Sequence, residues 1–194
     1  MSTKTLMSGS AIGPALHRVI LAASPLPVQQ LGEVRALSPH LSEAEFLTTR
    51  HVEYLPEQRR IWDGTPDLQA AARRFAVQIY EPVRRLLGPL HVNSGYRCPG
   101  LNLAVGGHPQ SRHMLGLAAD VVPMEYEIDR AMTVLAGAVR AGAIPDVDQA
   151  IVECGSWIHL QAAPVGAIAR RQVLTSDDGK TFAQYPPAGG GQAA

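Results

Sequence analysis

The chain has 194 residues, a length that fits one domain with a sizeable hydrophobic core. Its 17 basic and 17 acidic side chains cancel to a formal net charge of zero, whereas a protein that binds nucleic acid regardless of sequence needs a basic surplus. No apolar run reaches the length of a membrane span, and the stretch VILAAS at residues 19–24 is shorter than the core of a secretory signal. We therefore expect no nucleic-acid partner, no membrane span and no signal peptide.

The two ends of the chain differ in composition from the part between them. Residues 1–37 contain Ser, Gly and Pro punctuation and only short apolar runs, which is typical of an arm. The stretch PPAGGGQAA at residues 186–194 has no bulky apolar side chain with which to pack. We predict a folded domain at residues 38–185, between an arm that docks to a partner protein and a flexible tail.

The longest predicted helix covers residues 65–87. Thr65 is placed to cap it, Pro82 should kink it and Gly88 should end it. Its apolar side chains recur at steps of three and four along one face: Leu68, Ala72, Phe75, Ile79, Val83 and Leu86. This periodicity predicts an amphipathic helix that packs on the core.

Three further helical segments are predicted. Ser42 precedes Glu45 by three residues, a capping-box spacing that should begin a short helix. Residues 99–105 suit one or two helical turns, and residues 125–142 suit a second amphipathic helix.

Short β-prone runs separated by turn residues predict a sheet. They are LHVNS at 90–94, LAADVV at 117–122, QAIVE at 149–153 and WIHLQA at 157–162. We predict an α+β fold in which a small antiparallel sheet is flanked by the 65–87 and 125–142 helices.

A histidine and an aspartate stand seven positions apart in SRHMLGLAADVV, with Gly116 between them. The glycine interrupts a helix, so His113 is expected at the end of a loop and Asp120 on the strand that follows. Together with His159 they form a set of three ligands that suits catalytic zinc, because the fourth position stays open for water. Ser111 is placed to orient the loop or the imidazole. Taken alone, a segment of this kind more often contains a core histidine and a capping aspartate.

A second carboxylate lies near the third candidate ligand. Glu153, Trp157 and His159 share parity, so one continuous strand would direct all three to the same face. If Gly155 and Ser156 turn the chain instead, Glu153 and His159 still converge across a hairpin. A carboxylate beside zinc serves as the general base in metal-assisted peptide hydrolysis. Trp157 is then a wall of the cleft, or else an ordinary core residue.

The segment VNSGYRCPGLN supplies a further candidate. Arg97 follows a Gly-Tyr pair at a strand end, where its guanidinium can bind a substrate carboxylate through two parallel hydrogen bonds, although a surface ion pair is the alternative. The two cysteines, Cys98 and Cys154, can form one bridge or none, and we expect both to point away from the cleft and to serve in packing. His108 is expected in a loop near the cleft rim.

Three motifs in this order, SGYR at 94–97, SxHxxGxAxD at 111–120 and ExxxWxH at 153–159, resemble the zinc peptidases of the D-alanyl-D-alanine carboxypeptidase family, family M15, and most closely the C-terminal domain of its subtype A. LSEAEF at 41–46, VNSGYRCPGLNLAVGGHPQSRH at 92–113 and RRQVLTSDDGKTFAQY at 170–185 extend the resemblance over about residues 38–185. It implies the fold shared with hedgehog signalling domains, in which an intact zinc site need not mean hydrolysis.

The resemblance also implies roles for individual residues. His113, Asp120 and His159 would bind one zinc ion, and Glu153 would be the catalytic base. Arg97 would help to polarise and position the scissile amide. Further substrate contacts are predicted for Ser94, Tyr96, Ser111 and Trp157. Other branches of the family place the glutamate three residues before the last histidine, a position that Ser156 occupies here.

The predicted activity is hydrolysis of peptide bonds in the stem peptides or cross-links of bacterial peptidoglycan, by a carboxypeptidase or an endopeptidase. The site of action would be the cell wall or periplasm, reached as a phage virion component or a lysin. The alternative is a structural component of a phage tail or baseplate, in which residues 1–37 dock to neighbouring proteins and the domain binds or locally degrades the wall.

Overall fold

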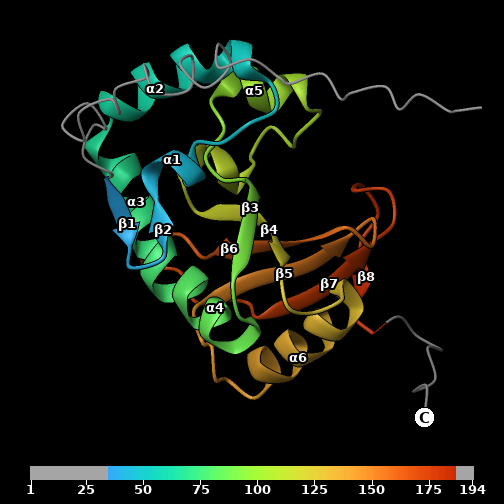
Figure 1. Cartoon of the computed structure of the whole chain (residues 1–194). Helices are drawn as coiled ribbons and strands as arrows, with labels where there is room; N and C mark the ends of the chain where they lie inside the picture. Colours follow the sequence, from blue (N-terminus) through green and yellow to red (C-terminus); the bar gives the residue numbers. More distant parts are fainter. Residues whose placement is uncertain (1–34, 187–194) are drawn as a thin grey trace, which may run out of the picture. The chain divides into compact units, whose positions relative to one another are not determined.

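The computed structural model describes residues 35–186 (Figure 1). Most of the predicted arm and tail, with the predicted docking segment, lies outside these residues. Ala36–Ser38 already form a strand, β1, whose Leu37 is buried. The folded region therefore begins before residue 38.

The elements follow one another in the order shown in Figure 1. The helices are α1 (Glu43–Phe46), the 3-10 helix η2 (Val52–Tyr54), α2 (Leu55–Asp63), α3 (Pro66–Phe75), the π-helix η3 (Ala76–Tyr80), α4 (Glu81–Leu87), α5 (Pro99–Ala104), the 3-10 helix η4 (Arg112–Leu115) and α6 (Ile128–Arg140). The strands after β1 are β2 (Leu41–Ser42), β3 (Leu90–Ser94), β4 (Ala118–Pro123), β5 (Val147–Glu153), β6 (Trp157–Ala162), β7 (Gln172–Ser176) and β8 (Ala183–Gln184).

A six-stranded sheet in the order β3-β4-β6-β5-β7-β8 forms the centre of the domain, and β1 and β2 form a separate small sheet. The predicted α+β class is confirmed, with one difference: β5 and β7 run parallel, so the sheet is mixed rather than wholly antiparallel. The reason lies in the neighbours of β6. Both of its edges are occupied, by β4 and by β5, so the returning chain pairs with the free edge of β5.

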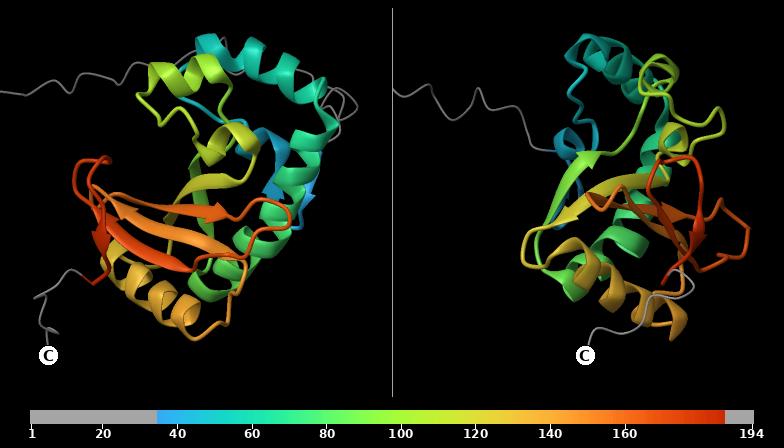
Figure 2. Two further views of the ribbon diagram at one scale, coloured as in Figure 1. Left: turned by 180° about the vertical axis from the view of Figure 1, so that it is seen from behind. Right: turned by 90° about the vertical axis from the view of Figure 1, so that its right-hand side faces the viewer.

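The helices α3, η3, α4 and α6 cover one face of the large sheet (Figures 1 and 2). Alternation along each strand sends the core side chains to that face, as with Ala119 and Val121 on β4 and Ile158 and Leu160 on β6, all fully buried. Asp120 lies between two of these core residues, so its side chain projects from the opposite face.

The predicted 65–87 helix is present, but it is not uniform. Thr65 stands at the N-cap without capping, because its hydroxyl donates instead to the carbonyl of Ile61 at 2.7 Å. The expected irregularity at Pro82 takes the form of the π-helix η3, which lies immediately before the turn that contains the proline. A proline has no N–H to donate, so the helix must change its hydrogen bonding there. Gly88 ends the helix with φ of 76°.

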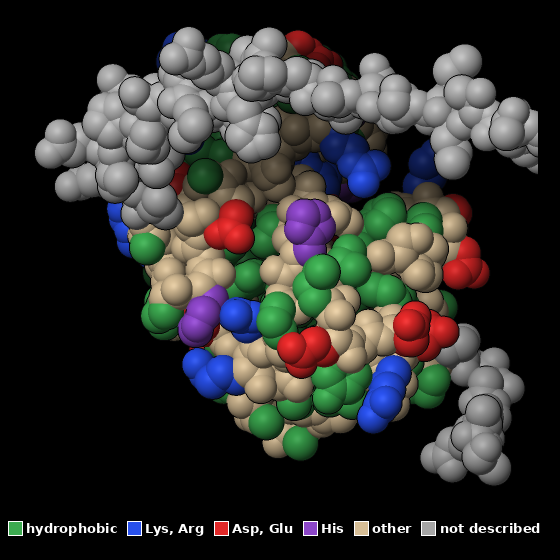
Figure 3. Space-filling view, viewed as in Figure 1, with side chains coloured by type: hydrophobic (Ala, Val, Ile, Leu, Met, Phe, Trp, Pro, Cys, Tyr) green, Lys and Arg blue, Asp and Glu red, His purple; other side chains and the backbone are tan. Residues whose placement is uncertain are grey.

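The other predicted helices and strands are confirmed with shifted ends. Ser42 and Glu45 form the full capping box at α1, and the 125–142 helix is shorter, as α6. The helix α2, whose Trp62 is fully buried, was not predicted from the sequence. None of the helices within residues 35–186 has the length and apolarity that crossing a membrane requires. Acidic and basic side chains are interspersed over the face shown in Figure 3.

Candidate metal centre

The 3-10 helix η4 carries His113 to the sheet. Ser111 caps this helix, since its hydroxyl accepts from the His113 amide at 3.4 Å, which is the orienting role predicted for it. Gly116 ends the helix in the left-handed conformation, with φ of 66°, and packs so closely on Leu68 that an added Cβ would lie 3.0 Å from it. Only glycine adopts this conformation at low cost in such a space, so Gly116 ends η4 and turns the chain towards β4. His113 lies inside this short helix rather than at the end of a loop, where it was predicted.

The other two candidate ligands lie side by side on adjacent strands. Asp120 on β4 pairs directly with His159 on β6, and on its other side pairs with Ser94 on β3. Directly paired residues project from the same face of a sheet. The register of three strands therefore sets Ser94, Asp120 and His159 in one row, and η4 delivers His113 to it.

The three candidate ligand atoms form a compact triangle. Asp120 Oδ1 lies 2.9 Å from His159 Nδ1 and 3.2 Å from His113 Nε2, and the two nitrogens lie 3.2 Å apart. Zinc with nitrogen and oxygen ligands at about 2.0–2.1 Å in tetrahedral geometry would separate those ligands by about 3.3 Å. The spacing of the triangle fits such an ion.

The protonation pattern also fits a cation. His113 donates from Nδ1 to the carbonyl of Gly95 at 2.6 Å, which leaves its Nε2 without a proton and facing the other two ligands. That acceptor depends on close packing: an added Cβ on Gly95 would lie 2.3 Å from the carbonyl oxygen of Phe46. Unprotonated nitrogen and carboxylate oxygen facing each other need a positive charge between them.

The electrostatics of the site favour the ligating forms of His113 and Asp120. Burial lowers the pKa of His113, although the Asp120 charge opposes this shift. Burial alone would raise the pKa of Asp120, but the charges and hydrogen bonds of the two histidines outweigh it and hold that pKa well below its usual range. A neutral imidazole and an ionised carboxylate are the forms that bind metal. For His159, the bonds and charges of its acidic neighbours outweigh burial and raise the pKa.

Arg97 lies behind the aspartate. Its NH2 group donates to Asp120 Oδ2, and its Nε donates to Ser94 Oγ at 2.8 Å. The two oxygens of Asp120 therefore face different partners, Oδ1 the histidines and Oδ2 the guanidinium. The Arg97 side chain is only 15% exposed, so little of the guanidinium is open to a further partner.

Glu153 and Trp157 lie at the tip of the β5–β6 hairpin, opposite each other. The hairpin alternative of the sequence analysis is thus the correct one, with the turn at residues 154–156. His159 pairs with Ile151, two positions before Glu153, so the carboxylate and the imidazole project from one face as diagonal neighbours. Burial raises the pKa of Glu153, partly offset by the charge of His159. Trp157 is half-buried beside it.

Several predicted residues lie elsewhere. Tyr96 is 2% exposed, and the centroid of its ring lies 5.8 Å from that of Trp62, so the residue belongs chiefly to the core and has almost no surface for substrate. Both cysteines are free thiols: Cys98 is buried as expected, but Cys154 is exposed in the hairpin turn rather than packed. His108 is exposed in the loop before η4.

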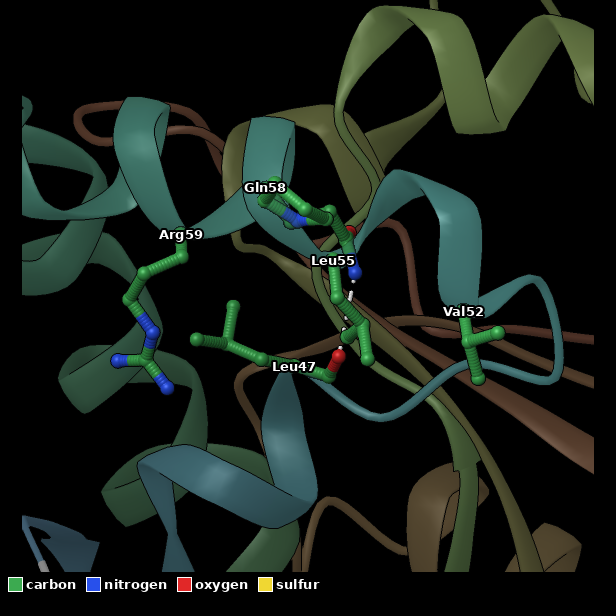
Figure 4. A pocket seen from close by; sticks show the side chains of 6 residues that line it. Leu47, Val52, Leu55, Gln58 and Arg59 are labelled. Carbon is green, nitrogen blue, oxygen red and sulfur yellow. Dashed lines mark hydrogen bonds between the residues drawn. The ribbon is translucent and has the colours of Figure 1, made fainter.

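Two cavities lie away from the three candidate ligands. One of about 420 Å³ is shown in Figure 4, where Gln58 donates to the carbonyl of Leu47 at 3.1 Å. The other, of about 390 Å³, is bordered by Tyr96, Met114 and Leu115 among others. Neither cavity is lined by a predicted metal ligand or by Glu153.

Comparison with known proteins agrees with this geometry. The sequence profile of the family described as Peptidase M15 matches residues 51–161, more than half of the chain, and the match contains all three candidate ligands and Glu153. No curated protein matches the chain significantly.

Proposed function

The chain belongs to the Peptidase M15 family, and on this basis we propose that it hydrolyses peptide bonds in the stem peptides or cross-links of bacterial peptidoglycan. Membership of this family supports the activity of a zinc-dependent metallopeptidase. The observation that carries the proposal further is the triangle of His113, Asp120 and His159, whose three candidate ligand atoms lie within 3.2 Å of one another, with a second carboxylate on the same face.

In the proposed reaction His113, Asp120 and His159 would hold one zinc ion. Bound zinc would polarise the scissile carbonyl and lower the pKa of water to about 7. Glu153 accepts the proton of the attacking water and passes it to the leaving amine. A carboxylate whose pKa is raised by burial suits this exchange, since it must both take up and release a proton near neutral pH.

Substrate contacts are proposed for residues around the triangle. Arg97 keeps N–H groups free beyond those bound to Asp120 and Ser94, and these would bind a carboxylate or a carbonyl of the peptide. Trp157 would border the cleft next to Glu153. Ser94 and Ser111 act mainly by holding Arg97 and the His113 loop in place.

The proposed site of action is the bacterial cell wall or periplasm, with delivery in a phage virion or as a lysin. The alternative proposal is a structural role in a phage tail or baseplate, in which the domain binds the wall and residues 1–37 dock to neighbouring proteins.

The decisive experiment is incubation of the purified full chain with isolated peptidoglycan, with and without a zinc chelator. Wild type should release products, and the chelator and Glu153→Ala should each abolish release. Glu127→Ala, which removes an exposed glutamate at the start of α6, is the matched control and should retain full activity.

The products distinguish the two peptidase types. Free D-alanine identifies a carboxypeptidase, whereas new amines on internal residues identify an endopeptidase. Release that survives chelation, or that Glu153→Ala retains in full, contradicts the zinc mechanism. Binding to the wall without any release supports the structural alternative.

A further inference from the structure

Asn102 on α5 has no part in the reaction proposed above, yet this polar residue is only 3% exposed. Its side-chain nitrogen Nδ2 donates to the carbonyl of His108 at 3.0 Å. Its backbone carbonyl accepts from the amide of Gly107 at 2.8 Å. One buried residue of α5 therefore binds two successive residues of the loop that joins α5 to η4.

This pair of bonds depends on glycine at position 107. A Cβ added to Gly107 would lie 2.3 Å from Asn102 Oδ1 and 3.1 Å from the backbone oxygen of the same residue. Atoms in a packed interior do not tolerate such distances. A side chain at position 107 would therefore displace either the loop or the Asn102 amide.

The helix that carries Asn102 is itself attached to the core. Cys98, the buried N-cap residue of α5, donates from its amide to Gln58 Oε1 at 3.2 Å. Gln58 is fully buried and also donates to the carbonyl of Leu47 (Figure 4). In the loop, by contrast, residues 105, 106 and 108–110 are exposed. Asn102 is therefore the anchored partner, and the loop is the part that it holds.

The carbonyl of His108 connects this loop to a candidate metal ligand. Besides the Asn102 side chain, it accepts from the amide of Ser111 at 2.9 Å. Ser111 is the N-cap of η4: its hydroxyl accepts from the amide of His113 at 3.4 Å, and its carbonyl accepts from that of Met114 at 3.2 Å. A continuous series of hydrogen bonds thus leads from Asn102 to the backbone of His113.

The surroundings of Asn102 are not those that stability alone would favour. Its Oδ1 is buried and has no hydrogen-bond partner within residues 35–186. A buried acceptor without a partner destabilises the folded state, and an apolar side chain would avoid this cost. The His108 carbonyl would still have Ser111 as a donor. The amide of Asn102 therefore serves to fix the path of the loop.

We propose that Asn102 is a positioning residue for the metal centre. Its bond to the His108 carbonyl fixes the loop before η4, and the fixed loop holds Ser111 where it caps that helix. His113 is thereby kept in the ligand triangle. The inference rests on the proposed function in that His113 is taken as a metal ligand. It adds that α5, which contributes no ligand, holds one in place.

Zinc affinity provides the first test. Asn102→Ala removes the donor to the loop, and we expect it to bind Zn²⁺ about tenfold more weakly, measured by competition with a chromophoric chelator at neutral pH. The matched control is Leu103→Ala. Leu103 is the next residue of α5 and is 80% exposed, so the same substitution there should leave zinc affinity unchanged.

Amide hydrogen exchange of the metal-free full chain, followed by NMR, provides the second test. In Asn102→Ala the amides of Ser111 and His113 should exchange about tenfold faster than in wild type, because the loop opens locally. The amide of Leu160, on the central strand β6, should exchange at the wild-type rate. If Asn102→Ala does not fold, Gly107→Ala replaces it, since its Cβ would break the same pair of bonds from the loop side.

The outcomes separate this inference from the proposed function. Where wild type binds zinc, a variant affinity within about twofold of wild type overturns the inference, and so does weaker binding with unchanged exchange at Ser111 and His113. Where wild type binds no zinc, the proposed function fails, and exchange alone decides. Unchanged rates, or equal acceleration at Leu160, overturn the inference, and faster exchange confined to Ser111 and His113 supports it.

Discussion

Substitution of Gly95 by alanine should damage the fold and the metal centre together. Gly95 follows β3 and contacts α1 so closely that an added Cβ would lie 2.3 Å from the Phe46 carbonyl oxygen and 2.6 Å from its ring. Ordinary contacts of a Cβ begin near 3.4 Å. The backbone must therefore move by about 1 Å at a point where the neighbouring atom is itself backbone.

The size of the effect follows from these contacts. Overpacking of this kind costs about 1–3 kcal/mol. The same Phe46 oxygen accepts from the Tyr96 amide at 2.8 Å, and loss of that bond adds about 1 kcal/mol. A total of about 2–4 kcal/mol should lower the melting temperature by roughly 4–16 °C for a domain of this size. Because the Gly95 carbonyl also holds His113, zinc affinity should fall as well.

Thermal unfolding by circular dichroism, in excess chelator and in excess zinc, measures both effects. Gly137→Ala is the control, because nothing lies within 4 Å of a Cβ added there and Gly137 is inside α6. Alanine in place of a helical glycine should stabilise the protein by about 0.5–1 kcal/mol. The reasoning is refuted if Gly95→Ala melts at or above the wild-type temperature.

Three other predictions concern stability and reactivity. A thiol reagent should modify exposed Cys154 in the native protein and Cys98 only after unfolding, since burial also raises the pKa of the Cys98 thiol; two native thiols by mass spectrometry would contradict the burial. Ser42→Ala should lower the free energy of unfolding by about 1 kcal/mol, because it removes the capping box of α1, and urea titration would detect the change. Asp148→Asn should destabilise the protein at neutral pH by about 1–3 kcal/mol. Hydrogen bonds from Arg170 outweigh burial and lower the pKa of Asp148 in the folded state, so its stabilising effect is full above the unfolded pKa and declines as pH falls through the folded one; a difference from wild type that does not shrink in acid would refute this.

Local pattern predicted most of the elements and failed where hydrogen bonding depends on distant partners. The capping box of α1 needs only residues three apart, and it is present as predicted. The cap at Thr65 failed because its hydroxyl bonds to the preceding helix instead. The parallel pairing of β7 with β5 depends on both edges of β6 being occupied, which no single segment reveals. α2 was missed although its Pro56 stands in the first turn, a usual signal of a helix start.

The candidate ligands could be predicted because the family resemblance singled them out and local structure agreed with it. Gly116 separates a helical turn from a strand, and the single polar residue in AADVV must project away from the core. Tyr96 shows the limit of such reasoning, since its position beside Arg97 suggested substrate contact while Trp62, from the unpredicted α2, buries its ring. The hydrogen bond between Asp148 and Gln161 gave no signal, because their meeting depends on a bulge in β5 that the sequence does not mark.

The hairpin geometry also bears on the residue proposed as the base. Ser156, at the position where other branches of the family have glutamate, lies exposed in the turn, and its hydroxyl donates to the carbonyl of Cys154 at 2.9 Å. Glu153 is the last residue of β5, half-buried, and projects from the face that carries His159 and Asp120. A base must lie within reach of the proton it removes, directly or through one water. In this chain Glu153 lies on the ligand face at the strand end, whereas Ser156 in the turn has no carboxylate, so Glu153 is the residue to which the proposed function assigns the base.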